Sequence, residues 1–250
     1  MLLALGGAAG LSAAERAPVP GADFVSVLPS GTQAPAVHVG SFAMDRQPVT
    51  NAQYLAFVLE HPQWRRDRIA KLIADGDYLS HWAAADRLGE SVQPDQPVTR
   101  VSWFAARAYC EAHGGRLPDW QEWELVAAAD EQHADARHDP DWQAKILDWY
   151  GRPASEPLAN VGLGAANYYG IQDLHGLVWE WVEDFNALIV SGDSREQGDP
   201  DRLKFCGAGA LSLKDRENYA VLMRIAFLSS LEARSTAHSL GFRCASGRDP

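Results

Sequence analysis

The sequence predicts an α+β fold with little regular secondary structure. Three helices are expected far apart along the chain, and the runs between them are short and strand-like. Long stretches carry polar residues, glycines and prolines, and the chain contains nine tryptophans. Large aromatic side chains can hold a chain together where regular elements are few. Helices scattered among short strands favour α+β over a doubly wound parallel sheet.

Each expected helix begins at a side chain that can cap it. A side-chain oxygen at this position accepts hydrogen bonds from the free backbone N–H groups of the first turn. In the first and third helices, a Gln or Glu three residues later completes a capping box. The expected helices and their capping residues are 49–60 with Thr50, 103–113 with Ser102, and 119–129 with Asp119.

The composition is that of an ordinary soluble globular protein, with 250 residues, 46% hydrophobic and 22% charged. This length suits one large domain or two small ones. The net charge is −11, and an acidic surface repels phosphate backbones, so a nucleic-acid partner is not expected. After the first residues, no stretch is long and apolar enough to span a membrane.

The N-terminus resembles a secretory signal. An apolar run from Leu2 to Ala14 has small residues, Ser12 and Ala14, where a signal peptidase would cleave before Glu15. No Lys or Arg precedes the run, so either the basic start of the signal is missing or the segment is a buried part of the fold. We expect residues 1–14 to be a truncated signal peptide, 15–36 an extended lead-in and 37–246 the domain. The protein would then be periplasmic or secreted.

The three cysteines, Cys110, Cys206 and Cys244, leave one thiol over in any disulfide scheme. They are too few and too scattered for a structural zinc site. In an oxidising compartment, one disulfide and one free thiol are expected.

Five segments in a fixed order carry the most specific signal. They read FAMDRQPVTNAQYLAF at 42–57, PVTRVSWFAARAYC at 97–110, GRLPDWQEWE at 115–124, YGIQDLHGLVWEW at 169–181 and LGFRCA at 240–245. Together they resemble the motifs of the formylglycine-generating-enzyme (sulfatase-modifying-factor) family. The resemblance implies a formylglycine-generating-enzyme-like variant of the C-type lectin fold. It also implies a disulfide between Cys110 and Cys244.

The Trp-Glu-Trp segment is expected to build the core or the wall of a groove. Glu180 would be costly to bury without a charged partner, a backbone donor or a metal, and Arg116 and Arg243 are the candidate partners. His175 lies next to this segment and could reach a groove, although a surface or supporting role is commoner for such a residue. The tryptophans expected in the core or groove wall are Trp103, Trp123, Trp179 and Trp181.

The family's catalytic cysteine pair has no counterpart in this sequence. The resemblance implies an enzyme that oxidises a substrate cysteine with oxygen, using copper held by two cysteines. The corresponding segment, 205–230, keeps Arg224 and the serines after it, but no cysteine lies between Gly207 and Arg224. Copper(I) prefers thiolate or thioether ligands, and this segment offers only Cys206 and Met223. Copper is therefore not expected here.

The family's calcium positions are kept only in part. Asn160 and Val161 resemble the first calcium loop, in which an amide oxygen and a main-chain carbonyl suit a hard cation. In the second loop, Leu177 stands where the family has a ligating Asn. At most one structural calcium ion is expected.

Three functions stay open. Residues 174–181, 205–210 and 224–230 are similar to cysteine-poor relatives associated with bacterial copper nitrite reductases, which implies an accessory or maturation factor with a periplasmic protein or peptide partner. The second function is an oxidase that acts on another peptide, such as a siderophore precursor. The third is a non-catalytic binding module. The candidate groove residues are Cys206, Asp215, Tyr219 and Arg224, although 214–218 also fits a solvated loop and Cys206 a small buried residue.

Overall fold

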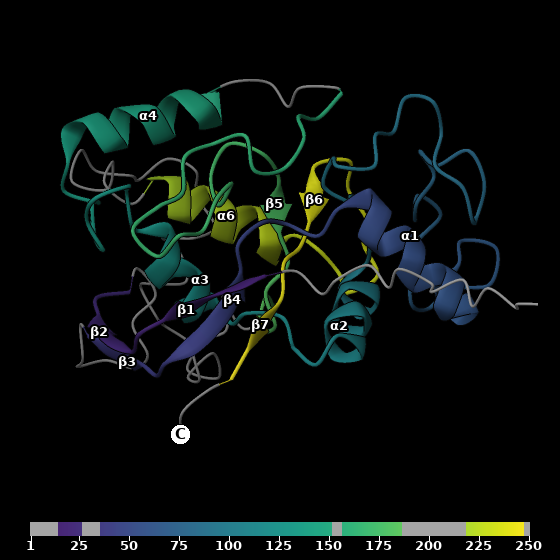
Figure 1. The fold of residues 1–250 in the computed structure, drawn as a ribbon, viewed down its shortest axis with the longest axis horizontal. Helices are drawn as coiled ribbons and strands as arrows, with labels where there is room; N and C mark the ends of the chain where they lie inside the picture. The colour runs from purple at the N-terminus through teal and green to yellow at the C-terminus, as the bar shows by residue number, and fades with distance from the viewer. Residues whose placement is uncertain (1–14, 27–35, 152–156, 187–218, 248–250) are drawn as a thin grey trace, which may run out of the picture.

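The structure is a computed structural model that describes residues 15–26, 36–151, 157–186 and 219–247. Within these ranges, short strands and short helices alternate with long irregular connections (Figure 1). This mixture agrees with the predicted α+β class. No helix in the described ranges is long and apolar enough to cross a membrane.

In the described part of the chain, the strands form three small sheets. The largest places β4 (Phe42–Asp45) between β1 (Arg16–Val19) and β7 (Ala245–Ser246), which both run antiparallel to it. A second antiparallel sheet joins β2 (Ala22–Phe24) to β3 (Val37–Val39). The third pairs β5 (Trp179–Glu180) in parallel with β6 (Leu240–Gly241). Because β1 and β2 fall within 15–36, the expected lead-in contributes strands to the domain.

The three predicted helices are present. They are α1 (Asn51–Glu60), α2 (Trp103–Ala112) and α3 (Trp120–Ala127), and a short 3-10 helix, η1 (Pro62–Trp64), follows the first. The capping boxes of α1 and α3 form as predicted, at Thr50 with Gln53 and at Asp119 with Glu122. Helix α3 ends two residues before the predicted end at 129.

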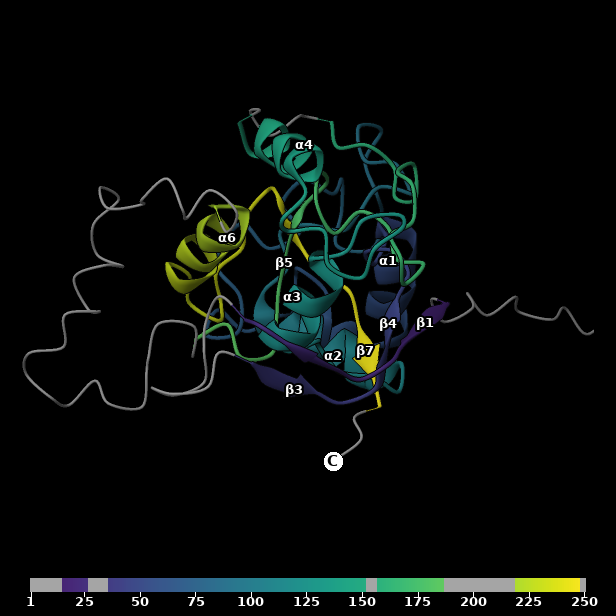
Figure 2. The same cartoon turned by 90° about the vertical axis from the view of Figure 1, so that its left-hand side faces the viewer.

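Two further helices were not predicted, α4 (Pro140–Gly151) and α6 (Tyr219–Ser229). Helix α4 carries an apolar stripe at helical spacing, from Trp142 through Ile146 to Tyr150, which went unrecognised among its polar neighbours. Helix α6 reads YAVLMRIAFLS and is apolar almost all round, which hides its periodicity. The two helices contact each other and lie on the other side of the molecule from α1 in Figure 1, and Figure 2 shows α6 opposite α1 with α4 at the top.

A disulfide ties α2 to the segment before β7. Cys110 and Cys244 are bonded, with their Cα atoms 5.5 Å apart, so the pairing implied by the resemblance is present. Both residues belong to one continuous hydrophobic core. The largest side chains that are completely enclosed in this core include Trp120, Trp123, Trp181, Tyr54 and Phe242.

Candidate functional site

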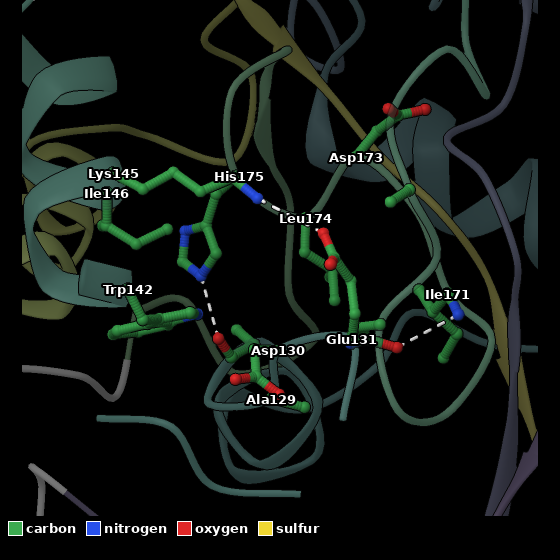
Figure 3. A pocket seen from close by; sticks show the side chains of 13 residues that line it. Ala129, Asp130, Glu131, Trp142, Lys145, Ile146, Ile171, Asp173, Leu174 and His175 are labelled. Atoms are coloured by element: carbon green, nitrogen blue, oxygen red, sulfur yellow. Dashed lines mark hydrogen bonds and ion pairs between the residues drawn. The ribbon is translucent and has the colours of Figure 1, made fainter. Parts of the chain in front are cut away.

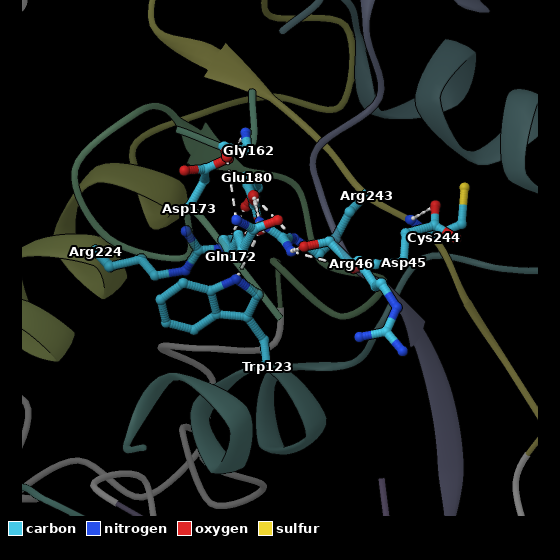
Figure 4. A network of polar contacts seen from close by, with 10 residues as sticks. All are labelled: Asp45, Arg46, Trp123, Gly162, Gln172, Asp173, Glu180, Arg224, Arg243 and Cys244. Atoms are coloured by element: carbon cyan, nitrogen blue, oxygen red, sulfur yellow. Dashed lines mark hydrogen bonds and ion pairs between the residues drawn. The ribbon is translucent and has the colours of Figure 1, made fainter. Parts of the chain in front are cut away.

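A buried polar centre lies where β5 and β6 pair (Figure 4). Glu180 of β5 is completely buried, and Arg243, three residues after Leu240, donates to both of its carboxylate oxygens at 3.0, 3.0 and 2.8 Å. The indole Nε1 of Trp123 donates to the same carboxylate at 2.9 Å. The predicted need of Glu180 for a charged partner is confirmed, and Arg243 meets it.

Arg243 also ties this centre to two other segments. Its Nη1 donates to the carbonyl of Asp45 at 3.1 Å, and its Nη2 donates to the carbonyl of Gln172 at 2.9 Å. Arg116, the other predicted partner of Glu180, instead pairs with Glu122, with two contacts of 2.6 Å. Glu122 completes the capping box of α3, which places its carboxylate beside Arg116 and away from Glu180.

Arg224 lies inside the protein and not on the wall of an open groove. It is 1% exposed, and its guanidinium carbon lies 3.6 Å from the centroid of the Trp123 ring. Its Nη2 donates to the backbone carbonyl of Glu180. Its buried Nε has no hydrogen-bond partner, and no carboxylate in the described ranges forms an ion pair with it. Burial lowers the pKa of Arg224 to about 10.

The remaining candidate groove residues are not placed by the structure. Cys206 and Asp215 lie outside the described residues. Tyr219 is the first residue of α6, and only its backbone position is described. These three predictions therefore stay predictions.

A cluster of half-buried aromatic rings from β5, α4 and α6 lies next to the polar centre at Glu180. Trp179 stacks on Phe227 of α6 at 4.9 Å and meets Tyr150 of α4 edge-on at 5.3 Å, measured between ring centroids. Two other tryptophans of the predicted set, Trp123 and Trp181, lie deeper. Trp181 is fully buried and donates to the Val101 carbonyl, whereas Trp103 is half-buried and donates to that of Val182. The predicted core or wall role of these residues is confirmed, and the sequence missed the rings that α4 supplies.

His175 is held as a neutral side chain within this cluster. Its Nε2 lies 2.9 Å from the carbonyl of Ala127, so Nε2 carries the proton that this bond needs. Its Nδ1 is then a bare acceptor, buried and without a partner among the described residues. The ring lies edge-on to those of Trp123 and Trp142. Burial is the largest cause that lowers the pKa of His175 to about 4.

A small pocket of about 110 Å³ lies next to His175 (Figure 3). Its floor is apolar and comes from the end of α3, from α4 and from the loop before β5. Its rim carries Asp130, Glu131 and Asp173 together with Lys145 and the ring of Trp142. The buried floor residues are Ala127, Ala129, Ile146, Ile171 and Leu174.

The loop proposed for calcium is closed by protein groups. The side-chain amide of Gln172 donates to the carbonyls of Gly162 and Gly164 at 3.1 and 2.6 Å. The N–H of Gly162 donates to Asp173 Oδ2 at 2.5 Å. Carbonyl oxygens bonded in this way are not free for a cation, which takes six to eight oxygen ligands. Asn160 is exposed, and no group of three or more acidic, His or Cys side chains suited to a metal lies in the described ranges. The bonded carbonyls belong to Gly162 and Gly164 and not to the predicted ligands Asn160 and Val161, so the calcium site stays a prediction.

The cysteines also fit the family's copper centre poorly. The chain has three cysteines, and the Cys110–Cys244 disulfide uses two of them. Only Cys206 remains to offer a thiolate. A copper site built on two thiolates of one chain therefore lacks its second ligand.

Comparison with known proteins assigns the family. Residues 2–248 match the family described as "Sulfatase-modifying factor enzyme 1-like domain". The chain belongs to this family. The match covers nearly the whole sequence, which agrees with the five ordered motifs and with the disulfide between the second and the last of them.

Three relatives show the range of the family around this chain. The hercynine oxygenase of Mycobacterium tuberculosis is 30% identical over 180 residues, which cover 66% of this chain and 42% of that protein. The formylglycine-generating enzyme of Streptomyces coelicolor is 28% identical and covers 85% of this chain and 80% of that protein. "Inactive C-alpha-formylglycine-generating enzyme 2" of Bos taurus is 28% identical, covering 84% and 79%. The chain spans less than half the length of the hercynine oxygenase.

Proposed function

We propose that this chain is an exported family member that does not carry out copper-dependent oxidation of cysteine and serves as an accessory or maturation factor. Its partner would be a periplasmic protein or peptide, from an enzyme of the copper nitrite reductase type. The observation that carries the proposal is the disulfide, because it leaves Cys206 as the only remaining thiol of the chain. Soft copper(I) needs more thiolate than one such residue offers.

Two features support export and a protein partner. Disulfides form and persist in oxidising compartments, and the apolar run at 2–14 resembles a signal peptide. We assign the domain to the C-type lectin type of fold, which presents variable loops over a fixed core. A helper protein needs such a recognition surface and needs no reacting group of its own.

The loss of the parent chemistry is tested with a CxPxR peptide, oxygen and copper(I). We expect mass spectrometry to find no conversion of the peptide cysteine to formylglycine. An active formylglycine-generating enzyme in the same buffer shows that the assay works. Conversion by this chain that depends on both copper and oxygen would refute the proposal.

The accessory role is tested in cells that carry this gene and a copper nitrite reductase. After deletion of the gene, the purified reductase should contain less copper per subunit and reduce nitrite more slowly. A plasmid copy should restore both values, and a copy without residues 1–14 should not, because the protein would stay in the cytoplasm. Unchanged copper content and activity in the deletion strain would contradict the role.

A second candidate function is an oxidase that acts on another substrate, such as a siderophore precursor peptide. The 30% identity to a protein named for an oxygenase reaction favours it, because the family then includes oxidations other than that of cysteine. Oxygen uptake that requires this chain and a peptide substrate would support it.

A third candidate function, a purely non-catalytic binding module, is favoured by the relative named as inactive. Partner binding without oxygen uptake or reductase maturation would select that function.

A further inference from the structure

The pocket beside His175 is large enough for one small side chain, and its apolar floor lies beneath a polar rim. Its floor residues are buried and apolar, and they come from three elements that are fixed in the core. An apolar cavity of about 150 Å³ can hold a benzene molecule, so about 110 Å³ suits a group of a few carbons. A valine or leucine side chain is of this class.

The rim of the pocket is negatively charged. Asp130, Glu131 and Asp173 line it. Lys145 Nζ lies 3.5 Å from Glu131, and His133, whose pKa is raised by its hydrogen bond to Asp130, offsets part of the charge of Asp130. Asp130 is held ionised by its bonds to the side chain and backbone of His133, which lower the pKa of Asp130 to about 2. Neutral His175 adds no compensating charge. The mouth therefore attracts a cationic group.

The loop that borders the pocket presents apolar side chains to solvent. Ala165 and Asn167 line the pocket, and in the same loop Leu163 is 76% and Tyr168 56% exposed. Single exposed apolar residues are common on protein surfaces. Two of them on either side of a pocket-lining segment provide apolar contact area around the mouth, as protein interfaces do.

We propose that this pocket is a docking site for a protein segment in which an aliphatic side chain is flanked by lysine or arginine. The aliphatic group fills the floor, the basic group lies against the acidic rim, and the Leu163–Tyr168 loop covers the neighbouring residues of the segment. The inference rests on the proposed function in one respect, since the segment would belong to the protein that this chain helps to mature. Binding itself is measured on this chain alone, so the two proposals can fail separately.

Isobutylamine, isobutanol and isobutyrate form a matched set of probes, because each carries a branched aliphatic group and they differ in charge. We expect saturable shifts in the NMR signals of the Ile146 and Leu174 methyl groups and the Trp142 indole. The affinity should fall in the order amine, alcohol, acid, and added salt should reduce the difference. No saturable shift with the amine, or equal binding of all three, would overturn the proposal.

Variants at the rim distinguish the contribution of charge to probe binding from the contribution of the cavity. Glu131→Lys should weaken isobutylamine binding about three- to tenfold, as expected when a partly screened charge is reversed. Glu90→Lys, an equal change at an exposed residue that does not line the pocket, should leave the affinity unchanged. Lys145→Gln should strengthen binding of the amine, and Ala165→Trp should block all three probes. Equal affinities for the Glu131→Lys and Glu90→Lys proteins would overturn the role of the rim.

A pair of peptides tests directly whether a segment with an aliphatic side chain flanked by lysines binds in the pocket. Gly-Lys-Val-Lys-Gly should bind and compete with isobutylamine, whereas Gly-Glu-Val-Glu-Gly should do neither. Binding of the basic peptide that does not displace isobutylamine would place its site elsewhere and overturn the proposal. If the amine binds but the reductase matures normally without this chain, the pocket stands and the accessory role fails.

Discussion

Two buried arginines on either side of Glu180 have opposite surroundings. Arg243 meets the Glu180 carboxylate with three contacts and also donates to the backbone carbonyls of Asp45 and Gln172. Among the described residues, Arg224 contacts the backbone carbonyl of Glu180 and the face of Trp123, and its Nε is unpaired. Both are buried, at 0% and 1% exposure.

The difference separates a structural cation from one that stability alone does not explain. A buried charge costs several kcal/mol unless a partner of opposite charge and good hydrogen bonds offset that cost, and about 1–4 kcal/mol can be gained by replacing ionic groups with apolar ones. Arg243 satisfies these conditions, and the next residue, Cys244, is fixed by the disulfide. Arg224 does not satisfy them, and it lies on the side with α4, α6 and His175.

The largest loss of stability is expected from removal of the Cys110–Cys244 disulfide, which lies next to Arg243. Its cysteines are 134 residues apart, and closing a loop of that length stabilises by about 4–5 kcal/mol in the chain-entropy model. Cys110→Ala combined with Cys244→Ala should lower the free energy of unfolding in urea by this order. Cys206→Ala is the control and should keep the bridge in non-reducing mass spectrometry. A double variant as stable as the wild type would show that the bridge does not constrain the unfolded chain.

Removal of Arg243 should be almost as damaging. Arg243→Met leaves the Glu180 carboxylate buried with the Trp123 indole as its remaining side-chain partner, and breaking such a pair costs about 3–5 kcal/mol. Adding Glu180→Gln should recover part of the loss, because the uncompensated charge is gone. Urea unfolding of the two single variants and the double variant measures the coupling. A single variant that loses less than about 1 kcal/mol would contradict the assigned role of this pair.

The contribution of His175 to the stability of the protein should be lost as the pH falls. Burial lowers the pKa of His175 from 6.5 to about 4, so the unfolded chain takes up a proton at a pH where the folded protein does not. The stability that this histidine contributes is present above about pH 6.5 and is lost as the pH falls towards 4. His175→Gln should reduce the slope of unfolding free energy against pH in that window. His81, whose pKa is also lowered to about 4, gives the matched variant His81→Gln, which should reduce the slope by a similar amount. An unchanged slope in His175→Gln would contradict a neutral, buried His175.

The sequence predicted the Arg243 side better than the Arg224 side, for physical reasons. Capping residues, the cysteine pair and the Glu180–Arg243 pairing are recorded in local motifs or in the resemblance. Arg224 lies on α6, which is apolar almost all round, so its helical periodicity is hidden in the sequence. The pocket has no motif at all, because its lining comes from 127–131, 142–146 and 165–175, which only folding brings together.

A much smaller effect is expected from Arg224 than from Arg243. Arg224→Met removes a buried cation that has no carboxylate partner in the described ranges and keeps most of its apolar packing. Its free energy of unfolding should lie within about 1 kcal/mol of the wild type or above it, since apolar replacement of buried ions is often neutral or stabilising. Arg224→Lys is the matched variant that keeps the charge and loses the planar stacking on Trp123. A loss as large as that of Arg243→Met would remove the distinction between the two arginines.

The smallest effect is expected from removal of calcium. The carbonyl of Gln172 accepts a hydrogen bond from Arg243, and its side-chain amide donates to carbonyls of the 162–164 loop. The hydrogen bonds around Arg243 therefore extend to this loop. A chelator should therefore leave the unfolding temperature of the wild type unchanged. Gln172→Glu places a carboxylate against two carbonyl oxygens, so this variant should be less stable in chelator and recover when calcium is added. Gln172→Leu should lose stability equally with and without calcium. A fall in the unfolding temperature of the wild type in chelator would instead support the calcium ion predicted at Asn160 and Val161, and the amide of Gln172 would then not be what closes the loop.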